Sequence, residues 1–412
     1  KRRKPEPSGL QGPSMHEVQT AVRPHRAFKT AGVQSCLFGS VNHGVVRGSH
    51  AFINFFIYTE TAAWEGVLAK ISLQSVISIE WLFVLSGFLI GTIMIRSFSK
   101  SDSWWQCSKD FWMRRWFRTL PSYYLFLLVN VLLVALGIEK GWFTWQFLVF
   151  SQNLLRGDVS DNFFGESWSL ALDEWFYLLM PIIIGLFFLL KKMENRYCFL
   201  LTAGVLIVLP ACARFFYPPV LDVWEWDLEI RRVTLYHLDA TGWGVLAAIV
   251  NNWYKEFWDR YSGLLGFLGA AAMLLGMYFL WILLDPGAWG QGVFSRAVNC
   301  VSITLLSVGT AMILPWLTKV SVHVLVDNIL GDFVEKISLY SYTIYLSHMP
   351  LLFFIRHVLN IDSRSSMVEI WFCVCIWLLA VYAFSSVVFH KFELPISRIR
   401  DRFTRRINSM PL

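Results

Sequence analysis

The chain has 412 residues, of which 56% are hydrophobic and 16% are charged. A soluble globular chain has about a quarter of its residues charged, so this composition excludes a disordered or collagen-like protein and disfavours a soluble enzyme. The net charge of +7 is explained by basic loops on the cytoplasmic side of a membrane, and we expect no nucleic acid partner.

Along the chain, nine apolar segments are long enough to cross a bilayer. A tenth segment before them is interrupted. Ala51–Tyr58 is strongly apolar, but its helical residues would cover only about 12 Å of a hydrocarbon core of about 30 Å. We therefore predict an all-α, polytopic membrane helix bundle with about ten transmembrane helices. The nine clear segments are 75–96, 119–138, 169–190, 198–216, 233–251, 262–284, 298–318, 338–356 and 368–390.

The basic residues predict the orientation of this bundle. With ten spans, most of the 36 Lys and Arg residues fall on one side, which the positive-inside rule makes cytoplasmic. Both termini are then cytoplasmic. We predict three parts: a disordered or non-native N-terminal segment at 1–43, a transmembrane domain at 44–396 and a basic cytoplasmic tail at 397–412.

Candidate residues lie in the first two predicted spans. His50 directly precedes the apolar AFINFF, and a buried neutral histidine can act as a general base; the alternative is a structural hydrogen bond to a neighbouring helix. Ser86 and Gly87 lie in LFVLSGFLIG, where small residues permit close helix approach. Helix packing is the simpler interpretation of Ser86 and Gly87.

Three arginines, Arg114, Arg115 and Arg118, lie at the predicted inner mouth of the third span. Arg115 and Arg118 are three residues apart, so they share a helix face. Guanidinium groups suit phosphate, and this cluster is a candidate phosphate site. The alternative is topology-setting charge in contact with lipid headgroups.

Two adjacent acids, Asp173 and Glu174, lie near the outer start of the fourth span in WSLALDEWFY. Polar groups at membrane depth are candidates for function. The alternative is capping, with Ser167 as N-cap and the acids favoured near a helix N-terminus. That explanation is strong for one acid and weaker for two.

Later spans carry further polar residues. His237 and Asp239 are two residues apart and cannot face the same way, so one could face a cavity while the other pairs elsewhere. His348 lies in SLYSYTIYLSHMP, a segment too polar for a lipid anchor, which we expect to face a cavity. The seven cysteines have no spacing typical of ligands, so we expect no metal site.

Six motifs follow one another at plausible spacing: FVLSGFLIG, RRWFR, WSLALDEWFYLLMP, YHLDATGWG, SYTIYLSHMP and FELP. Together they resemble the acyltransferase 3 family of integral-membrane O-acyltransferases, from about residue 50 to the end. The resemblance implies a ten-helix bundle in a bacterial inner (plasma) membrane. It also implies a cytosolic acyl-CoA donor, most simply acetyl-CoA, with no permanently bound cofactor. The acceptor would be a hydroxyl of an exported or envelope carbohydrate or glycolipid.

The family's site residues carry over unevenly. The family's catalytic histidine would be His50, but its basic partner eleven positions earlier would be Gly39, so we expect weak activity or none from this sequence. We also expect residues 1–49 not to be the native start of the fold. The acid of the Trp-Ser-Leu motif falls on the shorter Asp173. The remaining matches are Phe83, Ser86, Gly87, Arg115, Arg118 and Glu174.

The leading functional hypothesis is acyl transfer to a sugar hydroxyl. His50 would deprotonate that hydroxyl or relay the acyl group, the arginines would hold the donor's phosphates, and Ser86 and His348 would line the path. One alternative is an inactive or regulatory homologue, which Gly39 favours. The other is a transporter or flippase of a glycan or lipid, but the sequence has no paired Gly/Pro-broken helices in two related halves.

Overall fold

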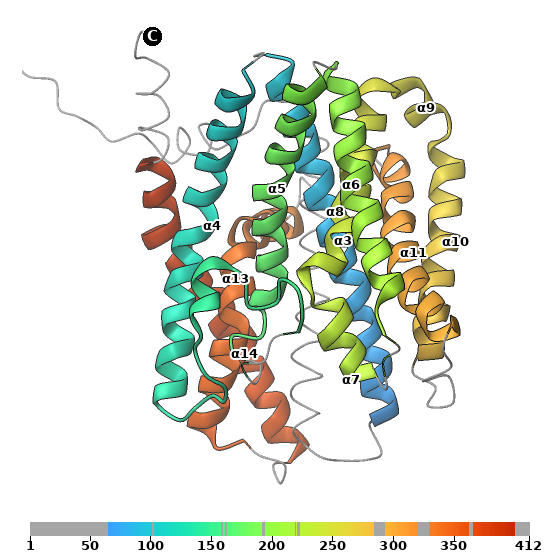
Figure 1. Ribbon diagram of the computed structural model, residues 1–412. Helices are drawn as coiled ribbons and strands as arrows, with labels where there is room; N and C mark the ends of the chain where they lie inside the picture. The colour runs from blue at the N-terminus through green and yellow to red at the C-terminus, as the bar shows by residue number, and fades with distance from the viewer. Residues whose placement is uncertain are drawn as a thin grey trace, which may run out of the picture.

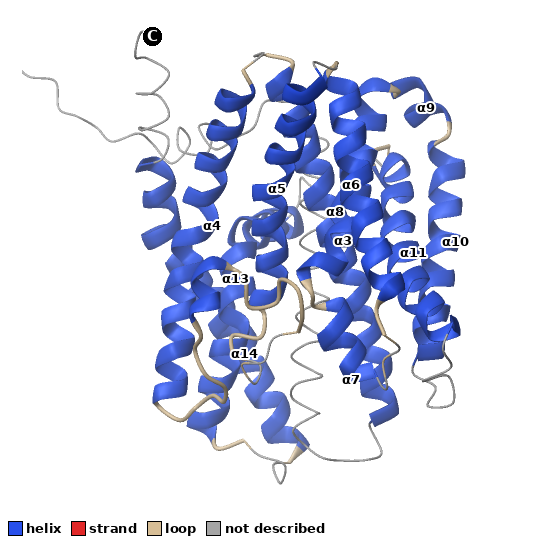
Figure 2. Ribbon diagram, in the orientation of Figure 1, coloured by secondary structure: helices blue, strands red, loops and turns tan. Residues whose placement is uncertain are grey.

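All regular structure in the described part of the chain is helical, which confirms the predicted all-α class (Figure 2). The computed structural model describes residues 65–100, 103–157, 160, 163–191, 194–218, 220, 223–283, 293–319, 329–361 and 366–399. The long helices are α3 (Glu65–Phe98), α4 (Trp104–Ala135), α5 (Ser167–Lys191), α6 (Asn195–Phe216), α8 (Thr234–Trp253), α10 (Ser262–Leu283), α11 (Val293–Leu317), α13 (Ile329–Leu359) and α14 (Met367–Val388).

Short helical segments join or extend these helices: η2 (Trp145–Val149), α7 (Val223–Trp226), η3 (Asp227–Arg231), α9 (Lys255–Arg260) and η5 (Phe389–Glu393). The long helices pack side by side into one bundle (Figure 1). Each of the nine predicted apolar segments coincides with one long helix. Among the described helices, seven are long and apolar enough to cross a membrane; α8 and α13 are not among these seven. The total of about ten, the cytoplasmic termini and the three predicted parts stay predictions.

The start of α4 differs most from its prediction. The apolar pattern predicts a start near residue 119, whereas the helix begins at Trp104, after an N-cap at Ser103 whose hydroxyl accepts from the backbone N–H of Gln106. Indole N–H groups of Trp104 and Trp112 donate to backbone carbonyls of α5 at 2.7 and 2.9 Å. These tertiary contacts stabilise a helical segment that the apolar pattern does not predict, because it carries several charged residues. The arginine cluster therefore lies inside a helix.

Helix α3 lies inside the bundle, and α10 lies at its periphery. In the apolar stretch of α3, 61% of the residues are buried, against 22% in α10. Helices α3 and α8 approach closely because each has a glycine at the contact. A methyl group on Gly87 would lie 2.0 Å from the carbonyl oxygen of Thr241, and one on Gly244 would lie 2.1 Å from that of Val84. The sequence-based packing role of Gly87 is thus confirmed.

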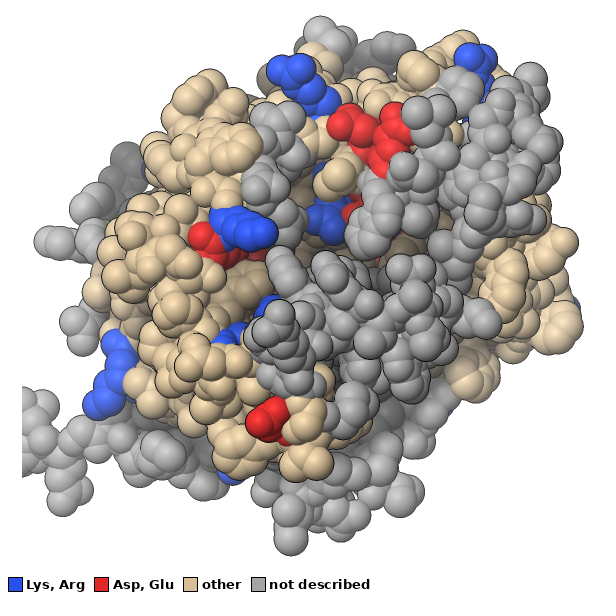
Figure 3. All heavy atoms as spheres, turned by 90° about the horizontal axis from the view of Figure 1, so that it is seen from below, with Lys and Arg blue, Asp and Glu red and all other residues tan. Residues whose placement is uncertain are grey.

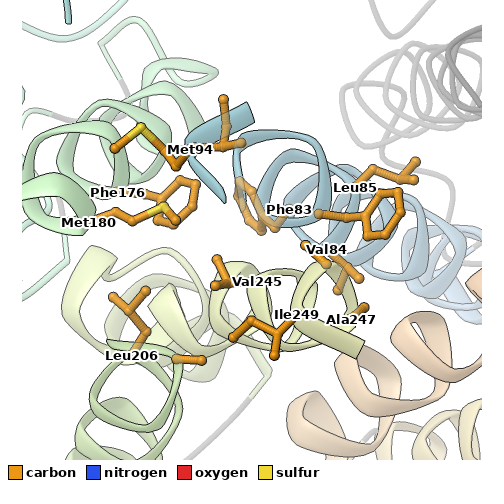
Figure 4. Packing of buried hydrophobic residues seen from close by; sticks show 14 of the residues in the cluster. Phe83, Val84, Leu85, Met94, Phe176, Met180, Leu206, Val245, Ala247 and Ile249 are labelled. Carbon is orange, nitrogen blue, oxygen red and sulfur yellow. The ribbon is translucent and has the colours of Figure 1, made fainter. Parts of the chain in front are cut away.

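Buried apolar side chains fill the space around this contact. Figure 4 shows Phe83 and Val84 of α3 facing Val245 of α8, with side chains of α5 and α6 closing the cluster. Such packing fixes the rotation of α3 about its axis. As a result, the polar residue next to Gly87 has a defined neighbour on α5.

Basic residues gather at one end of the bundle, which we call the basic end: Arg96, Lys100, Arg196, Lys255 and Lys319. The connections α3–α4, α5–α6 and α8–α10 lie together at this end (Figure 1). The connections α4–α5, α6–α8 and α13–α14 lie at the other, which we call the far end. Seen from the far end, charged side chains of both signs are set among uncharged ones (Figure 3).

Candidate active site

Polar residues spaced by four lie on one face of α5: Ser169, Asp173 and Tyr177. Residues at this spacing stack along a helix, here over about 12 Å. Each contacts a different neighbouring helix through Tyr345 of α13, Ser86 of α3 or Arg115 of α4. We call these six residues the polar track.

The middle of the polar track brings together two candidates predicted from separate motifs. The Ser86 hydroxyl donates to Oδ1 of Asp173 at 3.0 Å, and its oxygen lies 3.5 Å from the Tyr177 hydroxyl. Within the tight α3–α8 contact, Gly87 supplies close approach to α8, while Ser86 faces α5. One dipeptide therefore serves both helix packing and the polar track.

Capping does not explain the two acids of α5. The helix begins at Ser167, its first turn contains no acid, and the Ser167 hydroxyl accepts a hydrogen bond from the Gln152 amide at 3.1 Å. Asp173 is partly buried and Glu174 is buried. The predicted alternative of a Ser167 cap with Asp173 and Glu174 in the first turn is therefore wrong.

The three candidate arginines separate in the structure. The Arg115 guanidinium lies over the Tyr177 ring at 5.5 Å from its centroid, within electrostatic reach of Asp173 and Glu174. Arg114 and Arg118 are exposed on α4. Of the three, Arg115 alone belongs to the polar track, while the other two present charge at the surface of the helix.

At the other end of the polar track, His348 is buried with 1% exposure. Its Nδ1 lies 2.6 Å from the carbonyl oxygen of Tyr345. A carbonyl can only accept, so Nδ1 carries the proton in the neutral ring and Nε2 is the basic nitrogen. The Tyr345 hydroxyl lies within hydrogen-bond distance of the Ser169 hydroxyl and of the Glu166 carbonyl.

Glu166 is a buried acid that none of the sequence motifs indicates. Its side chain is 9% exposed, one carboxyl oxygen has no hydrogen-bond partner, and burial raises its pKa to about 8. At neutral pH this carboxyl group is mostly protonated. No pattern in the neighbouring sequence marks it, because its burial results from the loop that folds back toward α13.

His237 and Asp239 belong to two buried networks outside the polar track. His237 contacts Glu80 through Nε2, and its Nδ1 lies 2.6 Å from the Arg231 carbonyl; the other Glu80 oxygen accepts from Ser307 at 2.6 Å. Asp239 pairs with Arg214 of α6. Both ring nitrogens of His237 therefore have protein partners.

Two predicted features cannot be placed in this site. His50 and Gly39 lie outside the described residues, so the catalytic role of His50 stays a prediction. Within the described ranges, no group of three or more His, Cys, Asp or Glu side chains could hold a metal ion.

Comparison with known proteins gives a family and several distant relatives. Residues 37–387 match a family model described as "Acyltransferase domain", which confirms the predicted resemblance. The "Peptidoglycan O-acetyltransferase OatA" of Listeria monocytogenes is 31% identical over 143 residues, which are 29% of this chain and 21% of that protein. The "Putative O-acetyltransferase SACOL0978" of Staphylococcus aureus is 23% identical over 307 residues, which are 70% of this chain and 48% of that protein.

The chain thus spans less than half the length of either of these relatives. No solved structure matches.

Proposed function

The chain belongs to this acyltransferase family, and we propose that it is a membrane-bound O-acyltransferase that moves an acetyl group from acetyl-CoA to a hydroxyl of an envelope carbohydrate. The observation that carries the proposal is the polar track, which connects Arg115 with the buried His348 region through a bundle of apolar helices. Polar side chains at membrane depth are costly and commonly mark substrate paths.

The donor would bind at the arginine cluster. Coenzyme A carries about four negative charges on its phosphates, and guanidinium groups bind phosphate through paired hydrogen bonds. Exposed Arg118 and Arg114 would receive these phosphates from the cytoplasm, and Arg115 would direct the acyl-pantetheine arm toward Ser86. Asp173 and Glu174 would keep the Arg115 guanidinium in place.

The reaction forms a C–O bond to the acceptor oxygen and breaks the C–S bond of the thioester. A base removes the hydroxyl proton, which finally reaches the departing thiolate of coenzyme A. By resemblance to the family, we assign this base to His50. His348 is the alternative base at the end of the polar track, because its basic Nε2 results from the hydrogen bond at Nδ1.

A second candidate function is an inactive or regulatory homologue that keeps the donor site. Gly39 favours it, since the family has a basic residue at that position. Donor binding must therefore be measured separately from turnover.

Arg115→Lys combined with Arg118→Lys tests the donor site. Lysine keeps the charge but cannot form the paired hydrogen bonds, so we expect the Kd for acetyl-CoA, measured on detergent-solubilised protein, to rise about tenfold. Arg196→Lys, at an exposed arginine of the basic end, is the matched control and should leave Kd unchanged. An unchanged Kd in the double variant would mean that both arginines only set the membrane topology and do not bind the donor.

A further inference from the structure

We propose that Ser86 carries the acetyl group as a covalent ester between donor and acceptor, and that Asp173 is the base that activates its hydroxyl. This inference rests on the proposed function and deepens it, because it divides the transfer into two chemical steps. In the alternative, the acetyl group passes directly from the thioester to the acceptor.

The hydrogen bond of the Ser86 hydroxyl differs from that of Thr92 on the same helix. Serine and threonine within helices commonly donate to the carbonyl four residues earlier. Thr92 does so, to the carbonyl of Phe88 at 2.8 Å. Ser86 instead donates to Oδ1 of Asp173 on α5 at 3.0 Å. A hydroxyl that donates to a carboxylate already has a base in place for its proton, as nucleophilic catalysis requires.

The Ser86 side chain is not closed off by packing. Ser86 and Asp173 are both partly exposed, although Leu85 and Gly87, on either side of Ser86, are buried. A nucleophile must approach the thioester carbon closely, so some access to the hydroxyl is necessary. The tight α3–α8 contact at Gly87 fixes the backbone of the serine, while its hydroxyl stays within reach of a substrate.

A donor for the negative charge of the reaction lies beside Ser86. Attack by Oγ on a carbonyl carbon places negative charge on the carbonyl oxygen, which needs a hydrogen-bond donor nearby. The Tyr177 hydroxyl is 3.5 Å from Oγ of Ser86, so it can donate to the carbonyl oxygen of an acyl group attached there. The Arg115 guanidinium, which lies over the Tyr177 ring, adds positive charge on the same side.

The place of Ser86 along the polar track suits an intermediate carrier. Its partner Asp173 is four residues from Tyr177 and four from Ser169, about 6 Å along α5 in each direction. The phosphates of coenzyme A are costly to move into an apolar core, so the donor stays near Arg115. An acetyl ester is uncharged. It can therefore remain at Ser86 after coenzyme A has left and be reached from the far end.

Atoms and protons balance in both steps. In the first, Oγ of Ser86 forms a C–O bond to the acetyl carbon, the C–S bond of the thioester breaks, and the serine proton passes through Asp173 to the departing thiolate. In the second, the acceptor oxygen bonds to the same carbon, the ester bond to Oγ breaks, and the acceptor proton returns to Oγ. The base proposed for the acceptor, His50 or His348, acts in this second step.

The experiment detects the ester itself. The detergent-solubilised full chain, unchanged and with Gly39→Arg, is incubated without acceptor with acetyl-CoA that carries a radiolabelled acetyl group, and is then denatured in acid. We expect protein-bound label that resists neutral hydroxylamine and is released by mild alkali, as for an oxygen ester. Mass spectrometry should place one acetyl group on Ser86, within the tryptic peptide 71–96.

Variants separate the covalent role of Ser86 from a structural one. Ser86→Ala should carry no label, whereas Ser86→Cys should be labelled through a thioester that neutral hydroxylamine cleaves, a change of bond that packing does not produce. Asp173→Asn should slow labelling at saturating acetyl-CoA by about 100-fold or more, because it removes the base. Thr92→Ala, which removes a partly exposed hydroxyl from the same helix, is the matched control and should be labelled like the unchanged protein.

Equal labelling of Ser86→Ala and the unchanged protein, or an acetyl group on another residue, would overturn the inference. Acetylated carbohydrate in membranes without any acetyl group on Ser86 would also overturn it, and would leave the proposed function standing with direct transfer. Absence of label from both protein and carbohydrate would contradict the proposed function as well.

Discussion

The buried ion pair between Arg214 of α6 and Asp239 of α8 gives a quantitative stability prediction. Both side chains are 0% exposed, and their two hydrogen bonds measure 2.8 and 2.5 Å. Nη2 of Arg214 also donates to Thr304 at 2.8 Å, and Nη1 donates to the Tyr236 carbonyl. Removing either partner leaves the other charge buried without its counter-ion.

We predict that Arg214→Met and Asp239→Leu, each alone, lower the free energy of unfolding by about 3–5 kcal/mol. The double variant should cost only about 1–2 kcal/mol, because no charge is left unpaired and the main loss is a donor to the Tyr236 carbonyl. The Thr304 hydroxyl keeps its own bond to the Cys300 carbonyl at 2.8 Å. The two effects are therefore strongly non-additive.

The assay is equilibrium unfolding in mixed micelles, followed by the fluorescence of the 20 tryptophans. Arg196→Met, which breaks an exposed pair with Glu194, is the control and should change little. A double variant as unstable as the sum of the single variants would show that the buried charges do not interact as predicted. In that case, the pair would act through packing volume and not through charge.

Two further predictions concern helix packing and pH. Gly244→Ala should destabilise the protein by about 1–3 kcal/mol in the same unfolding assay, since the methyl group would overlap Val84, whereas Gly204→Ala, with open space beside it, should be neutral or slightly stabilising. Glu166 has a folded-state pKa of about 8, above its ordinary 4.5, so its contribution to stability is complete below pH 4.5 and is lost as pH rises through 8. Thermal unfolding between pH 6 and 9 should show a loss of stability that Glu166→Gln reduces and the exposed control Glu194→Gln does not; equal pH profiles for all three proteins would count against a buried, protonated Glu166.

Local sequence patterns predict the membrane helices well, because apolar length is a local property. The start of α4 is the exception, where contacts from Trp104 and Trp112 to α5 extend the helix through charged sequence. The small residues Ser86 and Gly87 likewise predict close helix packing at this point of α3. That the partner of Gly87 is the Thr241 backbone on α8 follows only from the fold.

The candidate site is predictable as a set of residues but not as a set of pairs. Ser86 and Asp173 are 87 positions apart, and His237 and Glu80 are 157 apart, so no local spacing connects them. Glu80 and Glu166 escape notice because a single acid in sequence has no feature that marks it as buried. Such residues acquire their environment only when helices distant in the chain pack together.

The most direct test of the proposed acyl transfer follows the acetyl group of radiolabelled acetyl-CoA in bacterial membranes that contain the chain. The unchanged sequence is compared with Gly39→Arg, which restores the family's basic residue, and with Gly39→Arg combined with His50→Ala. We predict label in an envelope carbohydrate, more of it with Gly39→Arg, and its loss when His50 is also replaced. Carbohydrate labelling by the Gly39→Arg variant no higher than in membranes without the chain, or labelling that the added His50→Ala leaves unchanged, would contradict the account.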